Sequence, residues 1–160
     1  MSTVDPSRLD LPILASLAGA AVDEILLARL RAAGHPRIRR SHGYVFQRLL
    51  ADTPTVTELG IALGVSQQAA SKAVIELEEL GYVERSPDAA DSRLRRIALT
   101  GSGRAAIELA RRQRGAFEAD VLASLTPADA EAGRRLLLAL LAASGGLEAI
   151  ARRQVPVPSD

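Results

Sequence analysis

Residues 55–100 read TVTELGIALGVSQQAASKAVIELEELGYVERSPDAADSRLRRIALT. Thr55-x-x-Glu58 has the form of a capping box, and it opens a short helix that should stop at Gly64. Ser66 can cap a second helix, which Gly81 would end. The inward positions of this second helix are expected to be Ala70, Ala73, Val74, Leu77 and Leu80. The stretch therefore predicts two helices joined by a tight glycine turn.

A basic β-hairpin should follow these two helices. Two short strands are predicted near 82–86 and 95–99, and the residues between them, rich in Asp, Ser, Pro and Arg, can only form a loop. Two helices with a polar outer face on the second, followed by such a hairpin, describe a winged helix-turn-helix. That architecture puts one helix in the DNA major groove and the hairpin against the flanking backbone.

Helical patterns flank this core on both sides. Apolar residues recur at helical spacing from Leu11 to Ala33, and Gly34-His35-Pro36 should end that helix. Ser41 can cap a helix that runs to about Ala51. Beyond the hairpin, Thr100 or Ser102 should start a long helix to about Leu125, and Thr126-Pro127-Ala128-Asp129 predicts the start of the last one. The predicted class is mainly α with a small β wing.

The terminal helices carry more apolar surface than one packing face needs. Five leucines of the last helix cover roughly half of its circumference at about 100° per residue: Leu136, Leu137, Leu138, Leu140 and Leu141. The first helix is similarly broad, so we expect a homodimer. The alternative is that these leucines only close the core of one subunit. The whole chain, 1–160, is interpreted as one domain, with a DNA-binding core at about 41–100, dimerisation helices at about 9–34 and 101–154, and a disordered tail at 155–160.

Composition limits the other possibilities. The 160 residues are 48% hydrophobic but only 2% aromatic and include no cysteine, which excludes disulfides, thiolate metal sites and thiol-based redox sensing. The net charge of +1 means that any electrostatic attraction to nucleic acid must be local. No signal core and no run long enough to span a bilayer is apparent, so a soluble cytoplasmic protein is expected.

The core resembles the MarR family of bacterial transcriptional regulators, from about Ser41 to Gly103. Three motifs carry the resemblance: ELxxxLGVS from Glu58, LExLGYVxR from Leu77, and DSRxxxIxLT from Asp91. Gly60 and Ala70 are smaller than the residues usual at these positions, which suggests a closer approach of the two helices. Ser92 replaces a frequent wing arginine.

The resemblance implies a non-enzymatic homodimer that binds a pseudopalindromic operator as a repressor or activator. Many members of the family release DNA when a small molecule enters a cleft between the dimerisation and DNA-binding parts. Tyr44, Phe46 or Arg48 could line such a cleft, but no feature of the sequence separates pocket residues from core residues. The effector-binding residues therefore stay unassigned.

The second helix of the motif presents polar side chains near its N-terminal end. The candidate DNA contacts are Ser66, Gln67, Gln68, Ser71 and Lys72. Glutamine can bond an adenine edge, and lysine can reach guanine or phosphate. Simple N-capping is the alternative role for Ser66, and an ordinary solvated surface is the alternative for the others. Glu76 and Glu79 would repel phosphate, so only the first two turns should enter the groove.

Arginines dominate the hairpin. Arg93 is the first choice for a minor-groove contact, with Asp91 expected to orient an arginine. Arg95 and Arg96 alternate sides on a strand, so at most one should point at phosphate. Arg85 is a further candidate, either for the DNA backbone or for bracing the wing. Arg37, Arg39 and Arg40 could form a second phosphate contact or a solvated loop.

Other classes of function have weaker support. His35 and His42 are the only histidines, and nothing in their spacing supplies the carboxylates that a metal site would need. No nucleophile–base pair or phosphate-binding loop is apparent, and Gly101-Ser102-Gly103 is interpreted as a helix-entry turn. We therefore expect neither enzymatic activity nor a cofactor. A winged-helix module that binds protein instead of DNA is the main alternative, favoured by the low net charge.

Overall fold

The computed structural model describes residues 5–151 of the chain. A 3-10 turn at Pro6–Arg8 precedes α1 (Leu11–Ala32), which is followed by α2 (Arg40–Leu49), α3 (Val56–Leu63) and α4 (Gln67–Glu79). The hairpin consists of β1 (Val83–Pro87) and β2 (Arg95–Leu99), and α5 (Gly101–Leu122), α6 (Pro127–Ala143) and α7 (Gly146–Ala151) complete the chain. The predicted tail at 155–160 lies outside the described residues.

The capping residues predicted from the sequence form the expected contacts at the majority of the helix ends. Thr55 and Glu58 form the reciprocal capping box of α3, and the Ser66 hydroxyl accepts a hydrogen bond from the backbone N–H of Ala69 at 3.1 Å. Gly64 and Gly81 end α3 and α4 with φ of 66° and 74°, in the left-handed region that favours glycine. Together these caps set the lengths of the two helices and the turn between them.

Two predictions about the flanking helices need correction. Arg39, rather than Ser41, is the N-cap of α2, because the buried His42 ring accepts the Arg39 backbone N–H and the helix begins before Ser41. The last helical region is broken in two, since Gly145 adopts a φ of 73° between α6 and α7. The other predicted starts are confirmed: the Thr100 and Thr126 hydroxyls cap α5 and α6.

The core lies beneath α3, α4 and the hairpin. Leu59, Val74, Leu77 and Ile97 are fully buried there. A Cβ on Gly60 would lie 3.2 Å from the Val65 carbonyl oxygen and 3.6 Å from the Ala70 Cβ, so the expected close approach of α3 and α4 is confirmed. The hairpin pairs antiparallel from Val83 opposite Leu99 to Pro87 opposite Arg95. The Ile97 backbone N–H also donates to the Pro54 carbonyl, which joins the hairpin to the segment before α3.

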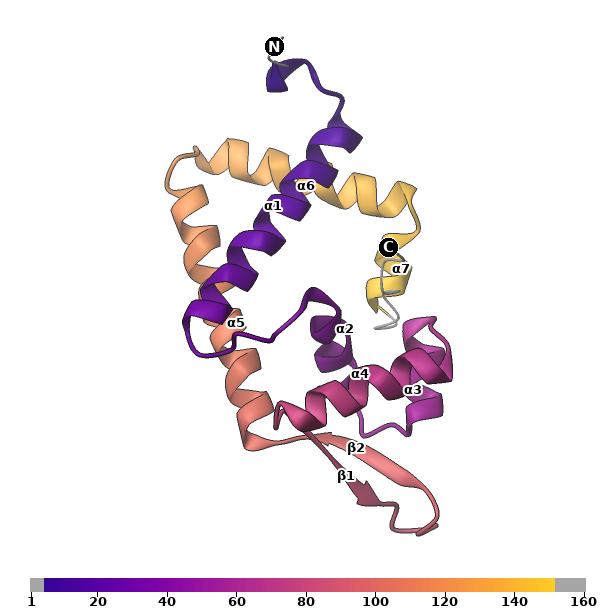
Figure 1. Cartoon of the computed structure of the whole chain (residues 1–160). Helices are drawn as coiled ribbons and strands as arrows, with labels where there is room; N and C mark the ends of the chain where they lie inside the picture. The colour runs from indigo at the N-terminus through magenta and orange to yellow at the C-terminus, as the bar shows by residue number, and fades with distance from the viewer. Residues whose placement is uncertain (1–4, 152–160) are drawn as a thin grey trace.

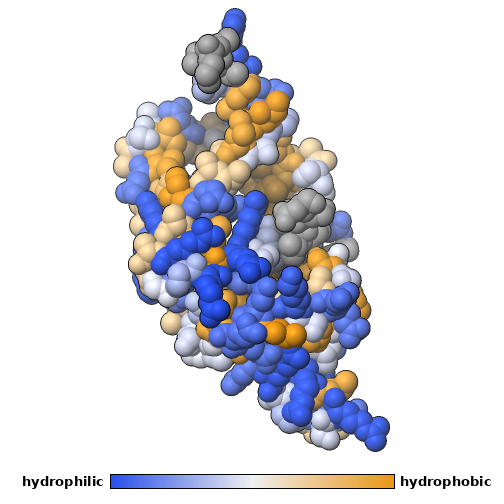
Figure 2. Space-filling model, viewed as in Figure 1, coloured by the Kyte–Doolittle hydropathy of each residue, from blue (hydrophilic) through white to orange (hydrophobic). Residues whose placement is uncertain are grey.

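Helices α1 and α6 form the other end of the molecule. α1 packs along α5, while α6 lies at the end opposite the hairpin (Figure 1). Apolar surface is visible over this end, and hydrophilic surface covers the end with α4 and the hairpin (Figure 2). α1 and α6 expose several large apolar side chains, among them Leu17 at 55% and Leu137 at 54%. The described residues of one subunit therefore leave these leucines uncovered.

One helix meets the length and composition of a membrane span, contrary to the sequence-based expectation. α1 is 22 residues long, and its first 18 residues carry only Asp23 and Glu24 as charges. The core helix of a soluble protein and a signal sequence pass the same test, so this is weak evidence for a membrane.

Candidate nucleic-acid interface

The first turns of α4 present a polar face. Gln67, Gln68 and Lys72 are exposed and Ser71 is half-buried, while Ala70, Val74 and Leu77 on the opposite side are buried. At about 100° per residue, the four polar positions fall within about 140° of the helix circumference. All four can therefore face one ligand surface together. Ser66 lies at the helix N-terminus, where its hydroxyl is used in capping and free backbone N–H groups favour an anion.

Sequence reasoning missed one member of this face. Ile75 lies on the same side of α4 as Ser71, one turn further along, and its side chain is 46% exposed. An exposed aliphatic side chain beside polar ones can contact the methyl group of a thymine. Its apolar character alone would assign Ile75 to the core. The signal available in the sequence was its position four residues after Ser71, which puts both residues on one face of the helix.

The hairpin loop presents arginines on a backbone held by carboxylates. Arg93 and Arg95 are exposed, and Leu94 between them is 43% exposed. Asp91 was expected to orient an arginine, and its Oδ1 accepts the Arg93 backbone N–H at 3.0 Å. The Asp88 carboxylate, which sequence reasoning missed, accepts the backbone N–H groups of Ala90 and Asp91.

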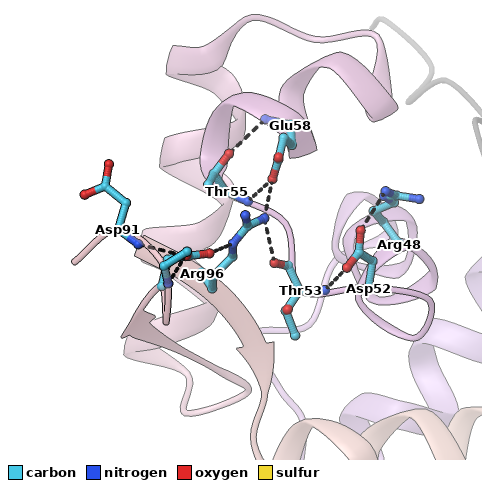
Figure 3. A network of polar contacts seen from close by, with 9 residues as sticks. Arg48, Asp52, Thr53, Thr55, Glu58, Asp91 and Arg96 are labelled. Atoms are coloured by element: carbon cyan, nitrogen blue, oxygen red, sulfur yellow. Dashed lines mark hydrogen bonds and ion pairs between the residues drawn. The ribbon is translucent and has the colours of Figure 1, made fainter. Parts of the chain in front are cut away.

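Arg96 points away from the exposed arginines and anchors the hairpin. Its Nε lies 2.5 Å from Asp88 Oδ2, and its Nη1 lies 2.8 Å from Glu58 Oε2 and 3.4 Å from the Thr53 carbonyl oxygen (Figure 3). Glu58 is also the capping-box residue of α3. A single guanidinium thus joins the wing to the start of α3, and the alternation expected of Arg95 and Arg96 is present.

The Arg96 contact should be measurable through the acidity of Asp88. The hydrogen bond from Arg96, helped by the N–H groups of Ala90 and Asp91, lowers the pKa of Asp88 from 3.8 to about 2. Because the folded-state pKa is depressed, the stabilisation is complete above about pH 4 and is lost as the pH falls through 2. NMR titration of the Asp88 carboxyl should give a midpoint near 2, and Arg96→Ala should raise it toward 3.8. Arg95→Ala should leave it unchanged; equal shifts in both variants would contradict the assignment.

Several other arginines are engaged within the protein. Arg85 Nε lies 3.0 Å from Glu78 Oε2 on α4, so Arg85 braces the wing rather than offering a free charge. Arg39 pairs with Glu76 at 3.1 Å and Arg40 with Asp23 at 2.8 Å. Of Arg37, Arg39 and Arg40, only Arg37 is exposed with no ion pair among the described residues.

A cavity of about 140 Å³ lies between α1, α2 and α5. Its wall combines apolar side chains such as Leu27 and Phe46 with four arginines: Arg39, Arg40, Arg111 and Arg114. Tyr44 and Arg48, which sequence reasoning also considered for a cleft, do not line it. In the described part of the chain, no group of three or more His, Asp or Glu residues is arranged to hold a metal ion.

A family model for the MarR family matches residues 42–94, which span α2, the helix-turn-helix and the wing loop. Over residues 42–94, about a third of its length, the chain is similar to the MarR family. Regulators of the MarR family are not enzymes, in agreement with the prediction from the sequence. No curated protein sequence matches the chain.

Solved structures of MarR-family proteins share the fold. MepR of Staphylococcus aureus, a transcription regulator of the multidrug efflux pump MepA, is 20% identical with a TM-score of 0.70, covering 84% of this chain and 98% of that chain. FabT of Streptococcus pneumoniae, solved in complex with DNA, is 19% identical with a TM-score of 0.69, covering 86% and 99%. A mutant of Escherichia coli MarR is 24% identical with a TM-score of 0.65, covering 83% and 97%.

Proposed function

We propose that this chain is a member of the MarR family, and that it is a sequence-specific, DNA-binding transcriptional regulator that acts as a homodimeric repressor on a pseudopalindromic operator in the cytoplasm. The observation that carries the proposal is the exposed polar face of α4 beside a wing whose loop exposes Arg93 and Arg95. Two of the solved relatives support it, since FabT and a MepR mutant are each described with bound DNA.

In this proposal α4 enters the major groove by its first two turns. Gln67, Gln68, Ser71 and Lys72 are the base-reading or phosphate-binding side chains, and Ser66 offers the helix N-terminus to a phosphate. Glu76 and Glu79 follow in the third and fourth turns, where their charges keep that end of the helix away from the backbone. Arg93 enters the adjacent minor groove, and Arg95 binds a phosphate.

The dimer proposal rests on the uncovered apolar faces of the terminal helices. Leu11, Ile13 and Leu17 on α1 are each about half exposed, as are Leu137 and Leu138 on α6. Apolar surface of this extent, gathered at the end opposite the hairpin, favours a subunit interface. A two-fold dimer joined there would present two α4 helices to two half-sites, which is what a pseudopalindromic operator requires. The division into a core at 41–100 and dimerisation helices at 9–34 and 101–154 belongs to this proposal.

The cavity between α1, α2 and α5 is the proposed site for a small-molecule effector. It lies between the helices assigned to dimerisation and α2 of the DNA-binding core. The lining holds four arginines but only one carboxylate, Asp23, and its other residues are mostly apolar, with two glutamines. A ligand with an apolar body and a negative charge therefore fits best. Binding there would change how α2 sits against α1 and α5, and thereby release DNA.

A protein-binding winged-helix module is the second candidate. It is favoured by the net charge of +1 and by the ion pairs that engage Arg39, Arg85 and Arg96 with carboxylates of the same chain. These pairs reduce the positive charge available to phosphate, although they leave Lys72, Arg93 and Arg95 exposed.

The two candidates are separated by fluorescence-anisotropy titration against a labelled duplex from the intergenic region upstream of the gene. A scrambled duplex serves as competitor, and the titration is repeated at two salt concentrations. We expect tight, competitor-resistant binding that weakens with salt. Absence of binding to any duplex at low salt would support the protein-binding module.

Arg93→Ala should weaken operator binding while leaving the fold and the oligomeric state intact. Each half-site loses one contact worth about 1 kcal/mol or more, so the dimer should lose roughly 30-fold in affinity. Arg112→Ala removes the same charge from an exposed position midway along α5 and is the matched control. Equal affinities for the wild type and the Arg93 variant would show that the wing assignment is wrong.

A further inference from the structure

A second, polar cavity lies between the start of α2 and the C-terminal half of α4. Its volume is about 170 Å³, and its wall consists of Arg37, Arg39, His42, Glu76, Glu79 and Leu80. His42 reaches it from within the protein, because its side chain is only 1% exposed. A buried histidine needs a partner for each ring nitrogen, and here one partner lies on each helix.

The contacts of His42 define which nitrogen carries the proton. Nδ1 lies 3.3 Å from the backbone nitrogen of Arg39, the N-cap of α2, and that nitrogen can only donate. Nδ1 is therefore the acceptor, and the proton is on Nε2, which lies 3.4 Å from Glu76 Oε2. Glu76 accepts this hydrogen bond, and its Oε2 also forms an ion pair with Arg39 Nη1 at 3.1 Å.

This arrangement joins α2 to α4 by directional bonds. Glu78 of α4 also pairs with Arg85, but that bond joins α4 to the hairpin. Toward the core, α4 packs through Ala70, Val74 and Leu77, and non-directional apolar packing resists separation of helices more than it resists rotation or sliding. Glu76 lies one turn beyond Lys72, on the same helix as the base-reading face. A bond that holds Glu76 therefore also sets the angle at which Gln67, Gln68 and Lys72 are presented.

We infer that His42 is a positioning residue for DNA recognition, which fixes the orientation of α4 by donating its Nε2–H to Glu76. The inference rests on the proposed function. His42 itself is too deeply buried to touch DNA, and its contribution passes through Glu76.

The protonation states of the pair agree with this role. Burial is the main effect on His42 and lowers its pKa, so the ring stays neutral and Nδ1 remains an acceptor. Desolvation tends to raise the pKa of Glu76, but the hydrogen bond from His42 and the charges of Arg39 and Lys72 outweigh it and lower the value. Near neutral pH the pair is thus a neutral donor and an ionised acceptor.

Two substitutions at position 42 separate the cap of α2 from the link to α4. His42→Asn places an acceptor where Nδ1 lies but has nothing at the Nε2 position, so the cap is kept and the link is lost. His42→Gln can place an amide N–H near the Nε2 position, so the link to Glu76 is restored. We expect His42→Asn to lose about tenfold in operator affinity, with unchanged affinity for scrambled duplex, and His42→Gln to recover most of that loss.

Glu76→Ala removes the acceptor of the same hydrogen bond. Because Glu76 is partly exposed, this variant can test the inference even if no substitution of His42 folds. It also removes a negative charge near the DNA, so affinity for scrambled duplex should rise while the ratio of operator to scrambled affinity falls. Thermal melting measured beside each titration shows whether the variants are folded.

The inference is overturned if His42→Asn keeps the wild-type ratio of operator to scrambled affinity. It is also overturned if the asparagine and glutamine variants lose operator affinity equally, since that result indicates a general packing defect. Failure of the wild-type protein to bind any duplex overturns the proposed function itself. Amide hydrogen exchange of Gln67–Glu79 then shows separately whether His42 restrains α4, by faster exchange in the asparagine variant alone.

Discussion

Leu137→Asp is expected to convert the protein from a dimer to a monomer. Leu137 is 54% exposed on α6, within the apolar surface proposed as the subunit interface. Burying a leucine contributes about 1.5–3 kcal/mol, and two-fold symmetry counts each substitution twice. The dimer dissociation constant should therefore rise by roughly a hundredfold to ten-thousandfold. Size-exclusion chromatography with light scattering, over a range of protein concentrations, measures the change.

Leu17→Asp on α1 should act in the same direction, because Leu17 is exposed to the same degree. Ile61→Asp is the matched control: Ile61 is a large aliphatic residue, 75% exposed, but it lies on α3 at the other end of the molecule. A wild-type mass equal to one subunit at all concentrations, or an equal response to the Leu137 and Ile61 variants, would contradict the proposed interface. DNA affinity should fall together with dimerisation, since one subunit reaches only one half-site.

Gly103→Ala should destabilise the folded protein by about 3 kcal/mol, at the upper end of what overpacking in a core costs. Gly103 is buried in the first turn of α5, where its N–H is bonded to the Thr100 cap. A Cβ there would overlap the backbone carbonyl oxygen of Tyr82, the residue directly before β1. This carbonyl has little freedom to move, because it also accepts the Thr100 backbone N–H. Chemical denaturation followed by circular dichroism, at one fixed protein concentration, gives the free energy of unfolding.

Gly115→Ala on the same helix is the matched control. No atom lies within 4 Å of a Cβ built at this position, and the residue is exposed. Alanine is favoured over glycine in a helix interior, so this variant should be more stable than the wild type by about 0.5–1 kcal/mol. Stability changes of the same sign in both variants would mean that the close approach of α5 to the hairpin is wrong.

The helix boundaries of the core could be predicted because their causes lie within a few residues. The Thr55 cap is satisfied by Glu58, three residues away, and Ser66 is satisfied by Ala69. Gly64 and Gly81 end their helices through their own backbone conformation. The start of α2 could not be found in this way, since the side chain that accepts the N–H of the N-cap Arg39 belongs to His42, and histidine gives no signal of helix capping in the sequence.

The candidate DNA-binding face was predicted more completely than the candidate effector site. The α4 residues share a face because helical spacing alone puts them there. The cavity instead combines α1, α2 and α5, and its four arginines come from segments about 70 residues apart in the chain. No local pattern distinguishes such arginines from those on a solvated surface.

By itself, the sequence determined the order of the elements, the turns of the helix-turn-helix and the polar face of α4, because these depend on short-range hydrogen bonds and periodic spacing. The tertiary structure alone decided which arginines remain available to a phosphate. Arg39 meets Glu76, 37 residues along the chain, and Arg96 meets Glu58, 38 residues away. Whether a charge is free depends on its nearest neighbours in space, and only folding brings those neighbours together.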